Sequence, residues 1–187
     1  SKGLGLNVQY SPDGQWMAGG GIVEGRDITK VWNASPPYDD HLELSFERQT
    51  IGLAFTRDSK RLVVGGQGRM LSVYDLRSSA KHDFGQHIGN DDVISIAASP
   101  DGKYMASASF DGTVMLWDAT RLEEWQEGRL VYEGGLTLFW GDFSPDSKCL
   151  AVGGRNGEIR ILDVESGDNL RTISNAHGDK VNCVSFS

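Results

Sequence analysis

The sequence predicts an all-β fold of four successive antiparallel sheets, each made of four short strands. Three observations predict it. One four-residue turn recurs at nearly constant spacing, short β-branched or aromatic segments surround every copy, and Gly and Asp stand at the segment ends. The chain holds 24 glycines and only 5 prolines, a ratio that favours many tight turns.

The recurring turn reads Ser11-Pro12-Asp13-Gly14, Thr56-Arg57-Asp58-Ser59, Ser99-Pro100-Asp101-Gly102 and Ser144-Pro145-Asp146-Ser147. Successive copies start 45, 43 and 45 residues apart, and the last residue lies 43 residues after the fourth start. Pro presets φ at the second position, Asp accepts local backbone hydrogen bonds, and Gly takes the left-handed fourth position. Such a turn reverses a strand, so each copy joins two antiparallel strands.

Strand-like segments occur in a fixed order around each turn. First strands are predicted at 6–10, 51–55, 93–98, 138–143 and 181–186, second strands at 16–20, 61–65, 104–109 and 149–153, third strands at 28–33, 70–75, 113–118 and 158–163, and weaker fourth strands at 42–46, 81–84, 130–133 and 170–174. Helical spacing is confined to a short connector at 121–127.

Four short strands every 43–45 residues is the period of a propeller blade. We therefore expect an all-β β-propeller with four blades of four antiparallel strands, at about 4–49, 50–92, 93–137 and 138–180, and an extra strand at 181–187. Residues 1–187 are expected to form a single, partial domain.

The third unit carries the most specific residues. Residues 99–118 read Ser-Pro-Asp-Gly-Lys-Tyr-Met-Ala-Ser-Ala-Ser-Phe-Asp-Gly-Thr-Val-Met-Leu-Trp-Asp, which resembles a WD40 repeat, including the Trp117-Asp118 pair that names the family. The other units are degenerate and have Trp32-Asn33, Tyr74-Asp75 and Leu162-Asp163 at that pair. The resemblance covers the whole chain. Because family members usually have about seven blades, it implies that these four belong to a larger ring.

The resemblance also implies a structural tetrad of hydrogen-bonded side chains in the third blade: His87, Ser107, Asp111 and Trp117. His87 lies six residues before Val93, where about four are usual in the family. Catalysis by these residues is disfavoured, because a nucleophile must be reachable and Ser107 is predicted in a central strand. The four histidines fall in connections between units, and the two cysteines form no Cys/His motif. We expect no catalytic residue, cofactor or metal ligand.

Candidate partner-binding residues also come from the resemblance. In WD40 proteins the residue before the turn Asp commonly lies on the top face, and the matching positions here are Gln67, Phe110 and Arg155. Phe110 is either an exposed binding hot spot or a side chain packed on the neighbouring loop. Arg155 either pairs with an acidic partner or is a solvated loop charge.

The sequence favours a non-catalytic scaffold for protein–protein interaction over an enzyme. The formal charge of −8 and the lack of any Lys/Arg run argue against nucleic acid, and no apolar stretch reaches the roughly 20 residues that span a membrane. Expected partners are other proteins or peptides, basic ones in particular, inside the cell. Two alternatives stay open. One is a self-assembling module, homo-oligomeric if the chain is complete. The other is a substrate receptor of a cullin-RING ubiquitin ligase. WD40 receptors of this kind carry a short sequence box, and Tyr74-Asp75-Leu76-Arg77 resembles it.

Overall fold

The computed structural model describes residues 8–23, 26–36, 41–44, 49–134 and 138–187. All regular elements among them are strands, and none of these residues belongs to a helix with the length and apolar composition that crossing a membrane requires. The strands are β1 (Val8–Tyr10), β2 (Trp16–Val23), β3 (Arg26–Asn33), β4 (His41–Leu44), β5 (Thr50–Phe55), β6 (Arg61–Gly66), β7 (Met70–Asp75), β8 (Lys81–Gln86), β9 (Val93–Ala98), β10 (Tyr104–Ser109), β11 (Thr113–Asp118), β12 (Arg129–Glu133), β13 (Leu138–Phe143), β14 (Cys149–Gly154), β15 (Ile159–Asp163) and β16 (Asn169–Ile173).

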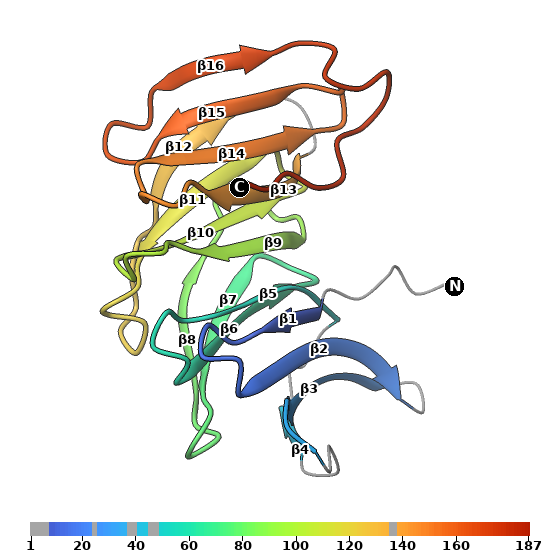
Figure 1. Ribbon diagram of the computed structural model, residues 1–187, viewed down its shortest axis with the longest axis vertical. Coiled ribbons are helices and arrows are strands. Elements are labelled where there is room, and N and C mark those ends of the chain that lie inside the picture. The colour runs from blue at the N-terminus through green and yellow to red at the C-terminus, as the bar shows by residue number, and fades with distance from the viewer. Residues whose placement is uncertain (1–7, 24–25, 37–40, 45–48, 135–137) are drawn as a thin grey trace.

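The strands form four sheets in which sequence neighbours pair antiparallel, in the orders β1-β2-β3-β4, β5-β6-β7-β8, β9-β10-β11-β12 and β13-β14-β15-β16. The sheets follow one another in chain order (Figure 1). The first strand of each sheet contacts the first strand of the next: β1 contacts β5, β5 contacts β9, and β9 contacts β13. First strands therefore gather at a common centre, and the predicted four blades of an all-β propeller are confirmed.

The recurring turn owes its shape to contacts within its own residues. In the third copy, Ser99 Oγ donates to Asp101 Oδ1 (2.7 Å) and accepts the Tyr104 N–H (2.9 Å). Asp101 Oδ1 also accepts the Lys103 N–H (3.1 Å). The same three contacts recur at the other three turns. Because these bonds are local, the turn forms wherever its four residues occur.

The Asp of the Trp-Asp pair has an equally local function. Asp118 Oδ1 accepts the backbone N–H (2.9 Å) and the hydroxyl (2.6 Å) of Thr120, so it caps the turn that follows β11. Asp75, Asp163 and Asn33 accept backbone amides two residues ahead in the same way. This explains why the pair keeps Asp or Asn in every unit while the Trp position varies.

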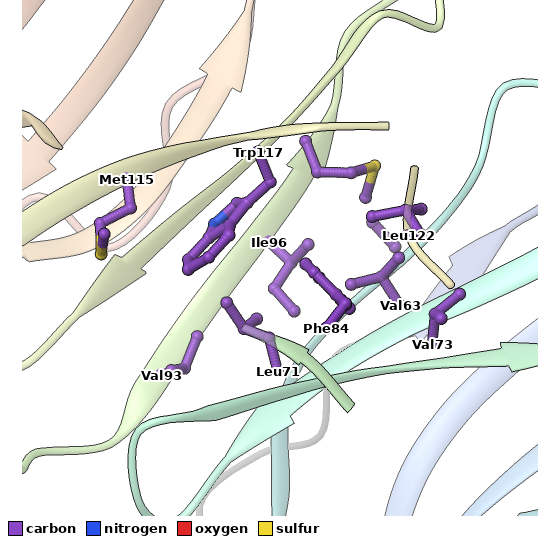
Figure 2. Close-up of a cluster of buried hydrophobic side chains, with 11 residues drawn as sticks. Val63, Leu71, Val73, Phe84, Val93, Ile96, Met115, Trp117 and Leu122 are labelled. Carbon is purple, nitrogen blue, oxygen red and sulfur yellow. The ribbon is translucent and has the colours of Figure 1, made fainter. Parts of the chain in front are cut away.

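Apolar clusters fill the spaces between adjacent sheets, one between each successive pair. Between the second and third sheets, Trp117 is 2% exposed and lies edge-to-face on Phe84, with ring centroids 5.6 Å apart. Figure 2 shows the indole among side chains from both sheets, with Leu71 and Val93 nearby. Such ring pairs add about 0.5–1.5 kcal/mol to the area they bury.

The connector between β11 and β12 is not helical, although helical spacing occurs at residues 121–127. It folds back onto the second sheet instead. Leu122 is fully buried in the cluster between the second and third sheets, Gln126 N–H donates to Phe84 O (2.7 Å), and Glu123 pairs with Arg61 (3.1 Å). These long-range contacts override the local periodicity, and the connector ties two sheets together.

The predicted extra strand at 181–187 is wrong, because these residues pair in no sheet. The Val181 N–H donates to Gly154 O at the end of β14 (3.0 Å), but no ladder of backbone hydrogen bonds follows it among the described residues. Val181 still packs on blade four as Val93 packs on blade two. Its Cγ1 lies 2.7 Å from where a Cβ on Gly153 would be, and Val93 Cγ1 lies 2.8 Å from the same point on Gly65. The segment is also held by the Phe186 N–H, which donates to Asp142 Oδ2 (3.2 Å).

Replacing Gly85 by Ala should destabilise the fold, because its Cβ would lie 2.2 Å from Cζ3 of Trp117. Overpacking of this kind costs about 1–3 kcal/mol. Urea unfolding followed by tryptophan fluorescence measures the loss. The control is Gly178→Ala, where no atom lies within 4 Å of the new Cβ and a change within about 0.5 kcal/mol is expected. Equal stability of the two variants would contradict the packing.

Candidate functional site

The third sheet contains a buried polar network built on Trp117. Ser107 lies in β10, and Trp117 lies in β11, the strand paired with it. His87 follows β8, in the connection from the second sheet to the third. The Trp117 indole Nε1–H donates to Ser107 Oγ (2.8 Å), and Ser107 Oγ lies 2.6 Å from His87 Nε2. His87 reaches this site although its spacing from β9 differs from the family pattern.

Asp111 joins the network through a residue that the sequence analysis missed. Its carboxylate lies 3.7 Å from His87 Nδ1, too far for a direct hydrogen bond. Thr113 Oγ1 lies between them, 2.9 Å from His87 Nδ1, and donates to Asp111 Oδ1 (2.6 Å). The signal available in the sequence was the Asp-Gly-Thr spacing, since Asp111 Oδ1 also accepts the Thr113 N–H (2.8 Å).

One arrangement of protons satisfies every member of this network. The indole Nε1 can only donate, so the Ser107 oxygen accepts and its own proton goes to His87 Nε2. His87 then carries its proton on Nδ1 and donates to Thr113, whose hydroxyl donates to Asp111. All donors point toward the carboxylate, so the chain of hydrogen bonds runs from the core to the turn between β10 and β11.

The carboxyl of Asp111 is held in its charged form. Its side chain is 10% exposed, and this burial works against ionisation. The nearby His87 ring and the hydrogen bonds from the hydroxyl and amide of Thr113 outweigh the burial and keep the pKa of Asp111 well below its usual value. The Gly89 N–H donates to the other carboxylate oxygen (3.1 Å). The Asp111 carboxylate therefore holds together the turn between β10 and β11 and the loop before β9.

The network has the properties of a structural element. Ser107 and His87 are each 1% exposed, and both ring nitrogens of His87 are engaged, so no substrate can reach the hydroxyl. No group of three or more His, Cys, Asp or Glu side chains among the described residues is arranged to hold a metal ion. In the other sheets smaller polar pairs occur, such as Thr29 with Thr50 (2.7 Å) between the first and second sheets.

The three predicted partner-binding residues lie in separate turns, between the second and third strands of the second, third and fourth sheets. Because strands alternate in direction, these turns lie at the same end of their sheets. Gln67 and Arg155 are exposed and Phe110 is half-buried. Two of the turns are anchored through their backbones, since Gln67 N–H donates to Gln49 O (2.9 Å) and Phe110 N–H to Asp92 O (3.0 Å).

At the opposite end of the sheets the connector after β11 presents Trp125, which is 53% exposed. Trp125 lines two hollows of about 370 Å³ each. At the same end, the residues that resemble a ligase-receptor box are largely engaged. Tyr74 and Leu76 are buried, Asp75 caps its turn, and Arg77 is the exposed one of the four.

Comparisons with known proteins agree with this geometry. A family model described as WD domain, G-beta repeat matches residues 79–118, and one described as Anaphase-promoting complex subunit 4 WD40 domain matches residues 137–187. Serine-threonine kinase receptor-associated protein of Gallus gallus is 26% identical, covering 84% of this chain and 55% of that protein. Actin-interacting protein 1 of Drosophila melanogaster is 30% identical, covering 86% of this chain and 26% of that protein.

Among solved structures, the β-propeller domain of Myceliophteria thermophila Cps50 (Swd1) matches with a TM-score of 0.80 at 14% identity, over 96% of this chain and 58% of that one. Four radially packed antiparallel sheets with this match define a β-propeller protein. With the family-model matches and the Trp-Asp repeat of the third sheet, the chain belongs to the WD40-repeat family. It spans about half the length of the first relative named above.

Replacing Ser107 by Ala should destabilise the chain, because the indole Nε1–H and His87 Nε2 both lose their partner. A buried group left without a hydrogen bond costs about 1–3 kcal/mol. Urea unfolding of Ser107→Ala measures the loss, with the exposed Ser174→Ala as a near-neutral control. A Ser107→Ala variant as stable as the control would show that the network contributes nothing.

Asp111→Asn should remove part of the acid sensitivity of folding. Because the pKa of Asp111 is lowered in the folded state, its carboxylate contributes stability above the unfolded value of 3.8. That contribution is lost as the pH falls through the folded-state pKa. The unfolding free energies of wild type and Asp111→Asn should therefore approach one another as the pH falls below about 4. Unfolding curves at several pH values measure this, and a gap independent of pH would contradict it.

Proposed function

We propose that this chain is a non-catalytic protein-interaction scaffold that binds partners through the turns carrying Gln67, Phe110 and Arg155. One observation carries the proposal. The buried network of the third sheet ends on Asp111, the residue directly after Phe110, and the Asp111 carboxylate holds that turn by three hydrogen bonds. An aromatic side chain on a turn fixed in this way loses little conformational entropy on binding.

The surroundings of Phe110 favour a basic partner segment. The loop before β9 lies beside Phe110, since Asp92 O accepts its backbone N–H. Asp91 in that loop is exposed, and neither Asp91 nor Asp92 forms an ion pair with a Lys or Arg of the described residues. A Lys or Arg of the partner would be attracted by these carboxylates and by the net charge of −8.

The relatives support a binding function in general terms. One is named for association with a serine-threonine kinase receptor and another for interaction with actin. We also propose a location inside the cell, in the cytoplasm or the nucleus, which the two free thiols support because a reducing compartment keeps cysteines unpaired. Self-association is the competing function, and the solution mass of the binding-competent species separates the two.

The proposal is tested with an array of basic peptides of about twelve residues and the same peptides with Glu in place of Lys and Arg. Phe110→Ala should weaken binding to the basic peptides about tenfold or more while the variant remains fully folded at the assay temperature. Trp125→Ala is the matched control, because it removes an exposed aromatic side chain at the opposite end of the sheets.

Two results would overturn the proposal. One is equal binding by Phe110→Ala and wild type, and the other is a loss in Trp125→Ala that matches or exceeds the loss in Phe110→Ala. Preference for the Glu-containing peptides would reject the basic partner and leave the position of the site to the two alanine variants.

A further inference from the structure

Two of the four recurring turns have Ser where the other two have Gly, and the backbone there is left-handed in all four. Gly14 and Gly102 have φ of 70° and 75°, while Ser59 and Ser147 have φ of 58° and 62°. Gly adopts this region freely, but a side chain makes it unfavourable. A serine at this position therefore carries a backbone cost that glycine avoids.

Both serines make the same interaction with the preceding sheet. Ser59 Oγ accepts the Asp13 N–H (3.1 Å), and Ser147 Oγ accepts the Asp101 N–H (3.0 Å). Each bond joins one recurring turn to the turn of the neighbouring sheet, and both serines are at most 8% exposed. The two bonds span the first-to-second and the third-to-fourth interfaces.

The interface between the second and third sheets is joined by an arginine side chain and not by a serine hydroxyl. The third turn has Gly102 at the fourth position and so offers no hydroxyl. Arg57 stands where the other turns have Pro, and its Nε–H donates to Pro100 O (3.1 Å). A Cβ on Gly102 would meet Arg57 Cβ at 3.3 Å, so the glycine leaves room for the arginine.

We propose that Ser59, Ser147 and Arg57 are positioning residues that fix the register of adjacent sheets through one turn-to-turn hydrogen bond at each interface. Apolar packing between the sheets is not directional, so by itself it allows neighbouring sheets to slide. A hydrogen bond depends on distance and angle and restricts that motion. This inference is independent of the partner, because the recurring turns lie at the opposite end of the sheets from Phe110.

The test compares Ser59→Gly and Ser147→Gly with the matched control Ser79→Gly in the intact chain. Ser79 has the same φ of 58°, but it is exposed in a turn inside the second sheet, where its N–H donates to Asp75 O. Ser79→Gly relieves the backbone and should raise the thermal midpoint. Ser59→Gly and Ser147→Gly also lose the inter-sheet bond, and their midpoints should lie about 2–4 °C below that of Ser79→Gly.

Amide hydrogen exchange at single residues separates loss of one hydrogen bond from a change in the stability of the whole fold. Ser59→Gly should speed exchange at the Asp13 amide and leave Asp101 unchanged, and Ser147→Gly should do the reverse. Arg57→Lys should lower the midpoint without changing exchange at either amide. If both serine variants gain stability as Ser79→Gly does, or if exchange at Asp13 and Asp101 stays as in wild type, the proposal is wrong.

Discussion

Burial of each sheet's faces against its neighbours is the constraint on which the rest of the structure depends. Each apolar cluster lies between two adjacent sheets and covers the faces that these sheets turn toward one another. The packing around Trp117 is close, because its ring leaves no space for a Cβ at either Gly85 or Gly128. The same constraint acts on residues 181–186, where Val181 is buried against Gly153 although no sheet forms around it. The position of residues 181–186 is therefore set by the burial of Val181, without a ladder of backbone hydrogen bonds to another strand.

The same indole connects the core to the candidate binding turn. Its ring fills the space between two sheets, and its Nε1–H starts the chain of hydrogen bonds that ends on Asp111. A rigid, buried donor thus orients a serine, a histidine and a threonine in turn. Because Asp111 directly follows Phe110, the packing that stabilises the fold also fixes the position of the side chain proposed to bind.

The sequence predicted what is decided locally. The Ser-Pro-Asp-Gly turns make their bonds within six residues, so their positions and the strands on either side followed from the pattern. Thr113 and Leu122 were missed because their contacts are set by other strands and sheets. The strand expected at 181–187 failed for the same reason, since strand formation depends on a partner that a local pattern cannot supply. The tetrad positions came from family resemblance, and Thr113 shows how much chemistry such a template leaves out.

The repeats are degenerate because the fold needs only part of the repeat signature. Local turns, the Asp or Asn caps and apolar contacts between sheets occur in every unit, and these build a sheet even where Leu162 replaces the tryptophan. The full polar network is found in the third sheet, where it rigidifies one turn. The other sheets have smaller polar pairs among their described residues, and the bonds between recurring turns lie at the end of the sheets opposite the proposed binding turns. On the two proposals made above, the units share what fixes the register of the sheets at one end, and the third unit alone adds the network behind Phe110 at the other.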